Sequence, residues 1–280
     1  RFCFRKRLFM DENEEVTKDI SEGLEYIRKH PEVSNVLLTG GDPMIMSTSK
    51  LGPIIESIRE IDHVKIIRIG TKIPAFNPYR IINDPSLHEM IRTYSTDEKK
   101  IYIMAHFNHP RELTPVAVKG LNMLMQSGAV VVNQTPMIKG VNDDPEVLAE
   151  LFNRLSFIGV PPYYVFLCRP TLGNEPFVIP IEEGYEVFEQ ARSRCSGLAK
   201  RARLVMSHET GKIEMVGISK GQVFLKYNRS ADVENDAKFL VFNSNPDAYW
   251  FDDYEEAFME LPGGYSGKAW FYKAKELLSL

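Results

Sequence analysis

The chain has 280 residues, of which 44% are hydrophobic and 26% are charged, a composition typical of globular proteins rather than disordered ones. The formal net charge of −4 at pH 7 leaves no basic field, so we expect no nucleic-acid partner. No apolar run reaches the roughly 18 residues of a membrane helix, so we expect no membrane partner, and three scattered cysteines favour a reducing cytoplasm.

Short β-rich segments alternate with amphipathic helical segments over the first 210 residues. The expected strands are 35–41, 64–71, 99–107, 129–135, 162–169 and 203–208. The expected helices are 14–30, 47–60, 84–94, 114–127, 145–158 and 182–195. Strands that are apolar on both faces and separated by helices indicate a parallel sheet covered on both sides. The number of repeats favours a partial (β/α)6-type barrel over an open doubly wound sheet, a choice that the pattern alone leaves open.

The pattern changes after about residue 211. "KIEMVGISKGQVFLKYNRSA" and "KFLVFNSN" are typical of antiparallel strands with turn residues between them. We therefore divide the chain into an α/β core, residues 1–210, and a β-rich C-terminal extension, residues 211–280.

Polar residues and glycines gather where the expected strands end, which is where barrel enzymes place their chemistry. They are Gly40, Gly41, Asp42, Thr71, Lys72, His106, Asn108, His109, Asn133, Gln134, Arg169 and His208. This coincidence predicts an enzyme.

Two motifs near the start of the chain each allow a chemical and a simpler interpretation. Cys3 in "RFCFRKR" has the basic surroundings that suit an iron–sulfur ligand, although a lone cysteine beside basic residues is more often incidental. "TGGDP" (39–43) lets backbone groups approach a ligand closely, but it lacks the GxGxxG spacing of a dinucleotide site and is weak as a bare turn.

Later motifs are equally open when each is taken alone. His106 and His109 could bind a metal, yet satisfied polar residues at a barrel mouth are the more common case, and Gln134 fits there as well. Lys212 follows Gly211 and could form a Schiff base in an apolar pocket, or simply end a surface turn. Arg169 follows the apolar run "YYVFLC" and is either an anion clamp or a solvent-facing strand end.

Taken together and in order, the segments resemble one family. The matching segments are "RFCFRKR", "LLTGGDPM", "IRIGTKIPAFNPYRI", "AHFNHPRELTP", "GAVVVNQTPMIKGVNDD" and "PYYVFLCRPTLGNEPFVIPIEEGYE". They resemble the lysine 2,3-aminomutase branch of the radical S-adenosylmethionine (SAM) superfamily from residue 1 to about residue 218. The resemblance implies a partial radical SAM barrel and an isomerase that moves an amino group between C2 and C3 of an amino acid. It also implies a [4Fe-4S] cluster, SAM and pyridoxal 5′-phosphate (PLP) as cofactors.

The resemblance assigns roles to the residues around the cluster and SAM. Cys3 resembles the third of three cluster ligands, so we expect the other two to precede Arg1 and the chain to be an N-terminal truncation. Gly40, Gly41 and Asp42 resemble the turn that holds the SAM amino group. His106 and Gln134 resemble residues that contact SAM at later strand ends.

The resemblance also places the PLP and substrate residues, with departures. Lys212 falls at the PLP lysine, and Arg5 at the arginine that binds the substrate α-carboxylate. Arg169 replaces an aspartate of lysine-specific members, and a second aspartate would fall near Met206 or Ser207, where no acid stands. A lysine side chain reaching a buried Arg169 would meet like charge, at a cost of several kcal/mol by order of magnitude, so we expect a glutamate-like substrate instead.

Two departures leave the cofactors partly open. "SHETGK" replaces the glycine-rich run that precedes the PLP lysine in the family, which leaves PLP use undecided, and the cysteines of a structural zinc have no counterparts, so we expect no zinc. The alternatives are a radical SAM enzyme without PLP, a non-catalytic binding or scaffold descendant, and a Schiff-base aldolase. The expected partners are an amino acid substrate, an electron donor such as a flavodoxin or ferredoxin, and further copies of the chain in a homo-oligomer.

Overall fold

The computed structural model describes residue 3, residues 19–255, residue 257 and residues 259–261. Over these residues the strands form a single ten-stranded sheet in which spatial order follows chain order, from β1 to β10. Pairing is parallel from β1 to β6 and antiparallel from β6 to β10. The sheet therefore changes from parallel to antiparallel pairing at the β6–β7 hairpin.

The predicted order of strands and helices is confirmed. The strands are β1 (Asn35–Leu38), β2 (Ile66–Thr71), β3 (Lys100–Ala105), β4 (Val130–Met137), β5 (Pro162–Leu167), β6 (Arg203–His208), β7 (Gly211–Ser219), β8 (Gln222–Ser230), β9 (Phe239–Asn243) and β10 (Met259–Leu261). The helices are α1 (Ser21–Lys29), α2 (Thr48–Arg59), α3 (Ile73–Phe76), α4 (Tyr79–Ile82), α5 (Pro85–Tyr94), α6 (Pro115–Gln126), α7 (Pro145–Phe157) and α8 (Ile181–Ser193). The short helices α3 and α4 were not expected, and residues 14–18 of the first expected helix lie outside the described residues.

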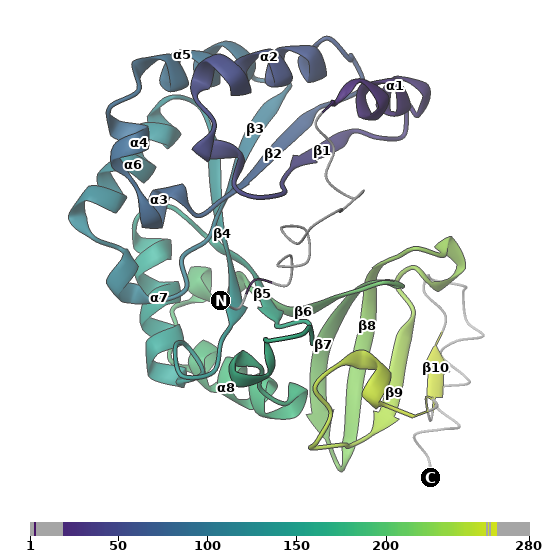
Figure 1. Cartoon of the computed structure of the whole chain (residues 1–280). Coiled ribbons are helices and arrows are strands. Elements are labelled where there is room, and N and C mark those ends of the chain that lie inside the picture. The colour runs from purple at the N-terminus through teal and green to yellow at the C-terminus, as the bar shows by residue number, and fades with distance from the viewer. Residues whose placement is uncertain (1–2, 4–18, 256, 258, 262–280) are drawn as a thin grey trace.

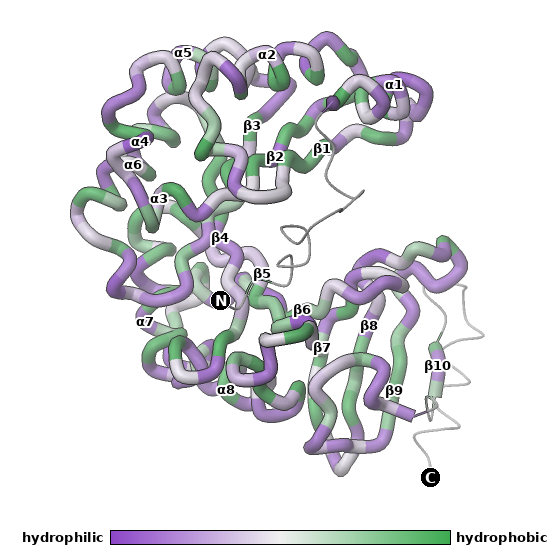
Figure 2. The backbone as a smooth tube through the Cα atoms, in the orientation of Figure 1, coloured by the Kyte–Doolittle hydropathy of each residue, from purple (hydrophilic) through white to green (hydrophobic). Residues whose placement is uncertain are grey.

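The parallel part of the sheet curves, with helices along its outer side. Figure 1 shows α2 to α7 outside strands β1 to β5 and the antiparallel strands β7 to β10 standing beside the open side of the curve. In Figure 2 the helices alternate between hydrophobic and hydrophilic colour along their length, as helices with one buried and one exposed face must. The predicted partial barrel with a β-rich extension is confirmed. Within the described residues, no helix has both the length and the apolar character to cross a bilayer.

The parallel strands present two different faces, as β4 shows. Its residues alternate strictly between half-buried and buried, with Val131 and Asn133 facing the helices and Val132 and Gln134 facing the concave side. The same alternation runs along β2. We call the concave side the lumen. Only the outer face is fully buried, which corrects the expectation that both faces are covered: the barrel is not closed, so its inner face stays accessible.

Two hydrophobic clusters hold the molecule together. The first lies between β1–β4 and the outer helices and includes Ile67, Ile103 and Leu121. The second lies under β5–β9 and includes Phe188 and Leu225. The second cluster therefore crosses residue 210, and the division of the chain into two domains at that point stays a prediction.

Capping residues explain why three of the outer helices start where they do. Asp84, Thr114 and Asp144 are the N-caps of α5, α6 and α7, and each side chain accepts a hydrogen bond from a backbone N–H of the first turn. A proline follows each cap, where its missing N–H costs nothing. These signals are local, which is why the sequence predicts the helix starts to within a residue or two.

Candidate active site

The turn after β1 is fixed by Asp42. Its Oδ1 accepts a hydrogen bond from the Met44 N–H at 3.0 Å, and its Oδ2 accepts one from the Lys72 N–H at 2.7 Å. Since Lys72 follows β2, one carboxylate ties together the ends of two neighbouring strands. Asp42 thus has a structural task that the sequence does not reveal.

The two glycines of this turn add no side chain to it. Gly40 has a φ of 138°, a conformation that side chains rarely adopt. A Cβ added at Gly40 or at Gly41 would meet no atom within 4 Å, so neither glycine is required by packing. Without side chains at these two positions, a bound molecule can approach the backbone of the turn closely.

His106 and Gln134 meet at the ends of β3 and β4. The Nε2 atoms of the two side chains lie 2.6 Å apart, so the amide N–H donates to a ring nitrogen that carries no proton. The His106 N–H donates to the Thr71 carbonyl oxygen at 3.0 Å, which continues the sheet by one residue. The structure thus brings these two predicted residues into direct contact.

Buried amides hold the segment after β3 against β4. The Asn133 Oδ1 accepts from the Phe107 N–H at 2.8 Å, and the Thr135 hydroxyl donates to the Phe107 carbonyl oxygen at 2.7 Å. The Asn142 side chain, fully buried, donates to the carbonyl oxygens of Asn108 and Pro136 at 2.9 and 3.0 Å. Asn142 was missed in the sequence, since its partners are backbone groups that only the folded chain brings near.

An ion pair links the segments that follow β2 and β3. The Lys72 Nζ lies 2.7 Å from the Glu112 Oε1, and the Glu112 Oε2 accepts from the Asn108 N–H at 2.6 Å. His109 accepts from the Arg111 N–H through Nδ1, so it caps a turn. Among the described residues, no group of three or more histidine, cysteine or acidic side chains is placed to hold a metal ion.

Lys212 lies on the lumen side of β7, against aromatic rings. Its Nζ is 4.6 Å from the centre of the Phe166 ring and 5.1 Å from that of Tyr164, and it donates to the Ser207 Oγ at 2.9 Å. Burial and, as a smaller cause, the positive charge of Arg68 together lower the pKa of Lys212 from 10.5 to about 8. A fraction of the amine is therefore neutral near pH 7, as a nucleophilic lysine requires.

Arg68 reaches the lumen from β2. Its Nε donates to the Asn35 Oδ1 at 2.8 Å, which fixes the side chain beside β1. The sequence does not single out Arg68, because an arginine within an apolar strand does not reveal which distant residue lies opposite it in the folded protein.

Arg169 follows β5 and is exposed, so the expectation of a buried guanidinium is wrong. Its carbonyl oxygen accepts from the Asn174 side chain at 3.3 Å, while its own side chain makes no hydrogen bond or ion pair with the part of the chain that is described. The polypeptide leaves the sheet here. Exposure describes the side chain without a substrate, so the role of Arg169 as an anion clamp stays a prediction.

The three cysteines differ in their surroundings. Cys3 is exposed, whereas burial raises the pKa of Cys168 to about 11, and its thiol donates to the Met137 carbonyl oxygen at 3.1 Å. Cys195 is buried and donates to the Ala191 carbonyl oxygen at 3.2 Å. Cys168 and Cys195 are therefore protonated and unsuited to a cluster. The predicted substrate residue Arg5 lies outside the described residues.

Comparison with known proteins decides the family. A protein of Aquifex aeolicus named "Putative L-lysine 2,3-aminomutase" is 56% identical to the chain over 268 residues, which cover 95% of this chain and 72% of that protein. The chain belongs to the lysine 2,3-aminomutase family. The resemblance of its ordered motifs to this family is thereby confirmed.

Other lysine 2,3-aminomutase relatives are more distant. The L-lysine 2,3-aminomutase of Fusobacterium nucleatum is 40% identical over 71% of this chain and 46% of that enzyme. The glutamate 2,3-aminomutase of Clostridioides difficile is 32% identical over 75% of this chain and 49% of that enzyme. The chain thus spans about half the length of these two relatives.

Solved structures and family models add little to this assignment. A radical SAM methyltransferase from Sphaerobacter thermophilus covers 74% of this chain and is itself covered to 62%, with a TM-score of 0.49 and 16% identity, a likeness too loose to extend the description of the fold. No protein-family model matches the chain.

Proposed function

We propose that the protein is an isomerase that moves an amino group between C2 and C3 of an amino acid, with a [4Fe-4S] cluster, SAM and PLP as cofactors. The single observation that carries this proposal is the partly neutral amine of Lys212, held against aromatic rings in the lumen. The resemblance implies that this residue is the counterpart of the family's PLP lysine. The named activities of its relatives on lysine and glutamate support the reaction class.

The surroundings of Lys212 fit PLP. A neutral amine can attack the cofactor's aldehyde carbon, and the faces of Tyr164 and Phe166 keep water from one side of the amine. When bound, PLP supplies a covalent hold on the substrate nitrogen and a ring that delocalises an unpaired electron. Before PLP binds, the hydrogen bond from Lys212 to Ser207 orients the amine.

The strand ends on the other side of the lumen fit SAM. Asp42 fixes the turn that contains Gly40 and Gly41, and the paired side chains of His106 and Gln134 offer polar contacts at the ends of β3 and β4. Cys3 is the described thiol that is exposed enough to bind iron. When bound, the cluster and SAM supply a carbon radical that removes a hydrogen atom from the substrate.

The charges near Lys212 and β5 bear on the substrate. The hairpin presents the neutral Ser207 to Lys212, and Arg169 ends β5 without a partner in the described chain, so a carboxylate side chain would find a guanidinium there. Because Arg169 is exposed, its repulsion of a lysine side chain at roughly 4 Å amounts to about 1 kcal/mol in water rather than several. We therefore propose a glutamate-like substrate. The main reason is the attraction between its side-chain carboxylate and Arg169, and the repulsion of a lysine side chain is a lesser reason.

The test uses the full-length protein, purified without oxygen and reconstituted with iron and sulfide. With a chemical reductant, the wild type should release 5′-deoxyadenosine from SAM and convert L-glutamate to its β-isomer. Arg169→Gln should raise the KM for glutamate about tenfold or more, since it removes a charged hydrogen bond. Isomerisation of L-lysine but not of L-glutamate would contradict the proposed substrate.

Lys212→Ala separates the proposal from a radical SAM enzyme without PLP. We expect the variant to bind SAM as the wild type does, to lose the visible absorbance of bound PLP and to form no product. A Lys212→Ala protein that still rearranges its substrate would show that Lys212 is structural. Failure of the wild type to bind iron or SAM would instead favour a binding or scaffold protein.

Three further parts of the proposal concern the setting of the enzyme. The electron comes from a small redox protein such as a flavodoxin or ferredoxin, the protein works in the cytoplasm, and it assembles as a homo-oligomer. Size-exclusion chromatography with light scattering tests the last of these directly.

A further inference from the structure

The β6–β7 hairpin has two faces with different tasks. Ser207 pairs with Lys212 across the hairpin, and His208 pairs with Gly211. Because successive strand residues point to opposite faces, His208 points away from the lumen while Ser207 and Lys212 face it. The His208 ring lies 5.2 Å from the centre of the Phe251 ring and 6.1 Å from that of Trp250, in the core of the extension.

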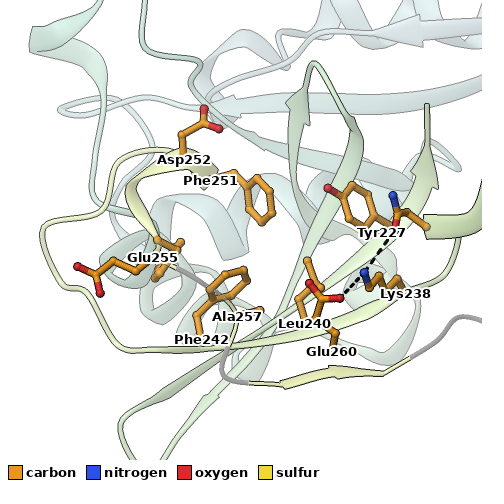
Figure 3. A pocket seen from close by; sticks show the side chains of 11 residues that line it. Tyr227, Lys238, Leu240, Phe242, Phe251, Asp252, Glu255, Ala257 and Glu260 are labelled. Atoms are coloured by element: carbon orange, nitrogen blue, oxygen red, sulfur yellow. Dashed lines mark hydrogen bonds and ion pairs between the residues drawn. The ribbon is translucent and has the colours of Figure 1, made fainter. Parts of the chain in front are cut away.

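His208 ties the back of this hairpin to the extension. Its Nε2 lies 3.0 Å from both carboxylate oxygens of Asp252, and its Nδ1 accepts from the Thr210 N–H at 3.2 Å. This pattern puts the proton on Nε2, which donates to Asp252. The His208 side chain is 4% exposed, whereas that of Asp252 is 68% exposed. In Figure 3 the Asp252 carboxylate points away from a cavity of about 420 Å³ that Phe251 and Phe242 line.

The rest of the hairpin turn is held against β8. The hydroxyl groups of Thr210 and Tyr227 lie 2.9 Å apart, and the Thr210 carbonyl oxygen accepts from the Ala231 N–H at 2.8 Å. At Gly211, with a φ of 146°, a Cβ would lie only 2.2 Å from the Arg229 carbonyl oxygen. The turn is therefore held by β8 on one side and by the contact between His208 and Asp252 on the other.

We propose that His208 and Asp252 are positioning residues for Lys212, holding its amine against Tyr164 and Phe166 by fixing the back of the hairpin. This inference rests on the proposed role of Lys212 as the PLP lysine. Neither residue touches the reacting atoms. They act on Lys212 through the backbone of the hairpin, because the pair His208–Gly211 is directly followed by the pair Ser207–Lys212.

The direction in which the Lys212 pKa changes distinguishes a positioning role of Asp252 from a direct electrostatic effect of its charge. Removing the Asp252 carboxylate takes away a negative charge, which by itself would lower the pKa of any nearby amine. If the hairpin instead loosens and Lys212 gains water, its pKa must rise. The charged groups on the strands around Lys212 include Arg68 on β2 and Arg229, its pairing partner on β8. They also include the ion pair between Arg203 of β6 and Glu214 of β7, and all four groups stay in place.

The experiment measures the pH dependence of Lys212 acylation by acetic anhydride, followed by mass spectrometry of the peptide, in the full-length protein without PLP. In the wild type we expect the midpoint near the pKa of about 8. In Asp252→Ala and His208→Ala we expect it to rise by about one pKa unit or more, which slows labelling near neutral pH about tenfold per unit. Asp252→Asn should leave the midpoint at or below the wild-type value, because its amide oxygen still accepts from His208 while the negative charge is gone.

A matched control comes from the same loop. Asp247 is exposed and its carboxylate makes no hydrogen bond or ion pair in the described chain, so Asp247→Ala should leave the midpoint unchanged. Asp252 is mostly exposed, so its alanine variant should fold, and circular dichroism checks this. An unchanged midpoint in folded Asp252→Ala overturns the inference.

Failure of the proposed function gives a different result. If the wild type has the lowered midpoint and Asp252→Ala raises it, but PLP adds no visible absorbance to the wild type, the positioning of Lys212 stands and its PLP role fails. If the wild-type midpoint is that of an ordinary lysine, the positioning inference is overturned, because no held amine exists.

Discussion

Lys212 carries a cost to stability that its proposed chemistry requires. Because its pKa is about 8 when folded and 10.5 ordinarily, the unfolded chain binds more protons between these values, and stability rises with pH there. Below pH 8 the charged amine opposes folding in full. Lys212→Met, which keeps the length of the side chain and removes the charge, should therefore make the apoprotein more stable at pH 7. Urea denaturation at pH 7 and about pH 10 checks this, since the advantage should shrink as pH rises through that range. An equal advantage at both pH values would mean that the gain comes from packing rather than from charge.

Gly211 is the residue on which the shape of the hairpin depends most directly. Its φ of 146° and the close approach of the Arg229 carbonyl oxygen exclude a Cβ. We expect Gly211→Ala to lower the free energy of unfolding by about 2 kcal/mol or more, through strain and a forced shift of backbone. Gly23 in α1 is the control, because a Cβ there meets no atom within 4 Å and Gly23→Ala should stabilise by up to about 1 kcal/mol. Thermal unfolding of both variants compares them, and a neutral Gly211→Ala would contradict the geometry of the turn.

At the scale of elements, Asp84 connects three helices. It caps α5, accepts from the Thr48 hydroxyl of α2 at 2.6 Å and pairs with Arg80 of α4. Burial tends to raise the pKa of Asp84, but hydrogen bonds from Ser86, Thr48, the Leu87 N–H and Arg80 outweigh it and hold this pKa well below its usual range. The carboxylate thus stabilises the protein above pH 4 and loses this contribution as the pH falls lower.

Asp84→Asn should cost about 1–3 kcal/mol at pH 7, because a cap and a charged hydrogen bond are weakened together. The difference from the wild type should narrow as the pH falls below about 4. Denaturant titrations at pH 7 and about pH 3 measure both parts. A difference that stays constant over this range would mean that the asparagine acts through packing.

At the scale of the whole molecule, the second hydrophobic cluster joins the two predicted domains. Phe152 and Leu204 lie before residue 210, and Leu225, Phe242 and Trp250 lie after it. We expect a chain that ends at residue 210 to expose this cluster and to lack a cooperative unfolding transition. A soluble fragment 1–210 with a sharp thermal transition would instead establish that residue as a domain boundary.

The sequence predicts much of this architecture and less of the site. Apolar strands and capped helices are local signals, so their order could be predicted, whereas α3 and α4 have four residues each and too little periodicity to detect. The resemblance located Lys212, but its lowered pKa depends on Phe166 and Arg68, which reach it from distant strands. The exposure of Arg169 could not be predicted either, because it depends on where the chain leaves the sheet.

The continuity of the sheet has a consequence for how such enzymes diversify. A barrel and an extension that were merely neighbours could drift apart in sequence without affecting each other's chemistry. Here the β6–β7 hairpin bearing Lys212 hydrogen-bonds to the parallel strand β5 on one side and to the antiparallel strand β8 on the other. Substitutions in the C-terminal extension can therefore change the surroundings of the Lys212 amine, the nitrogen proposed to react, while the parallel strand ends that face it stay unchanged.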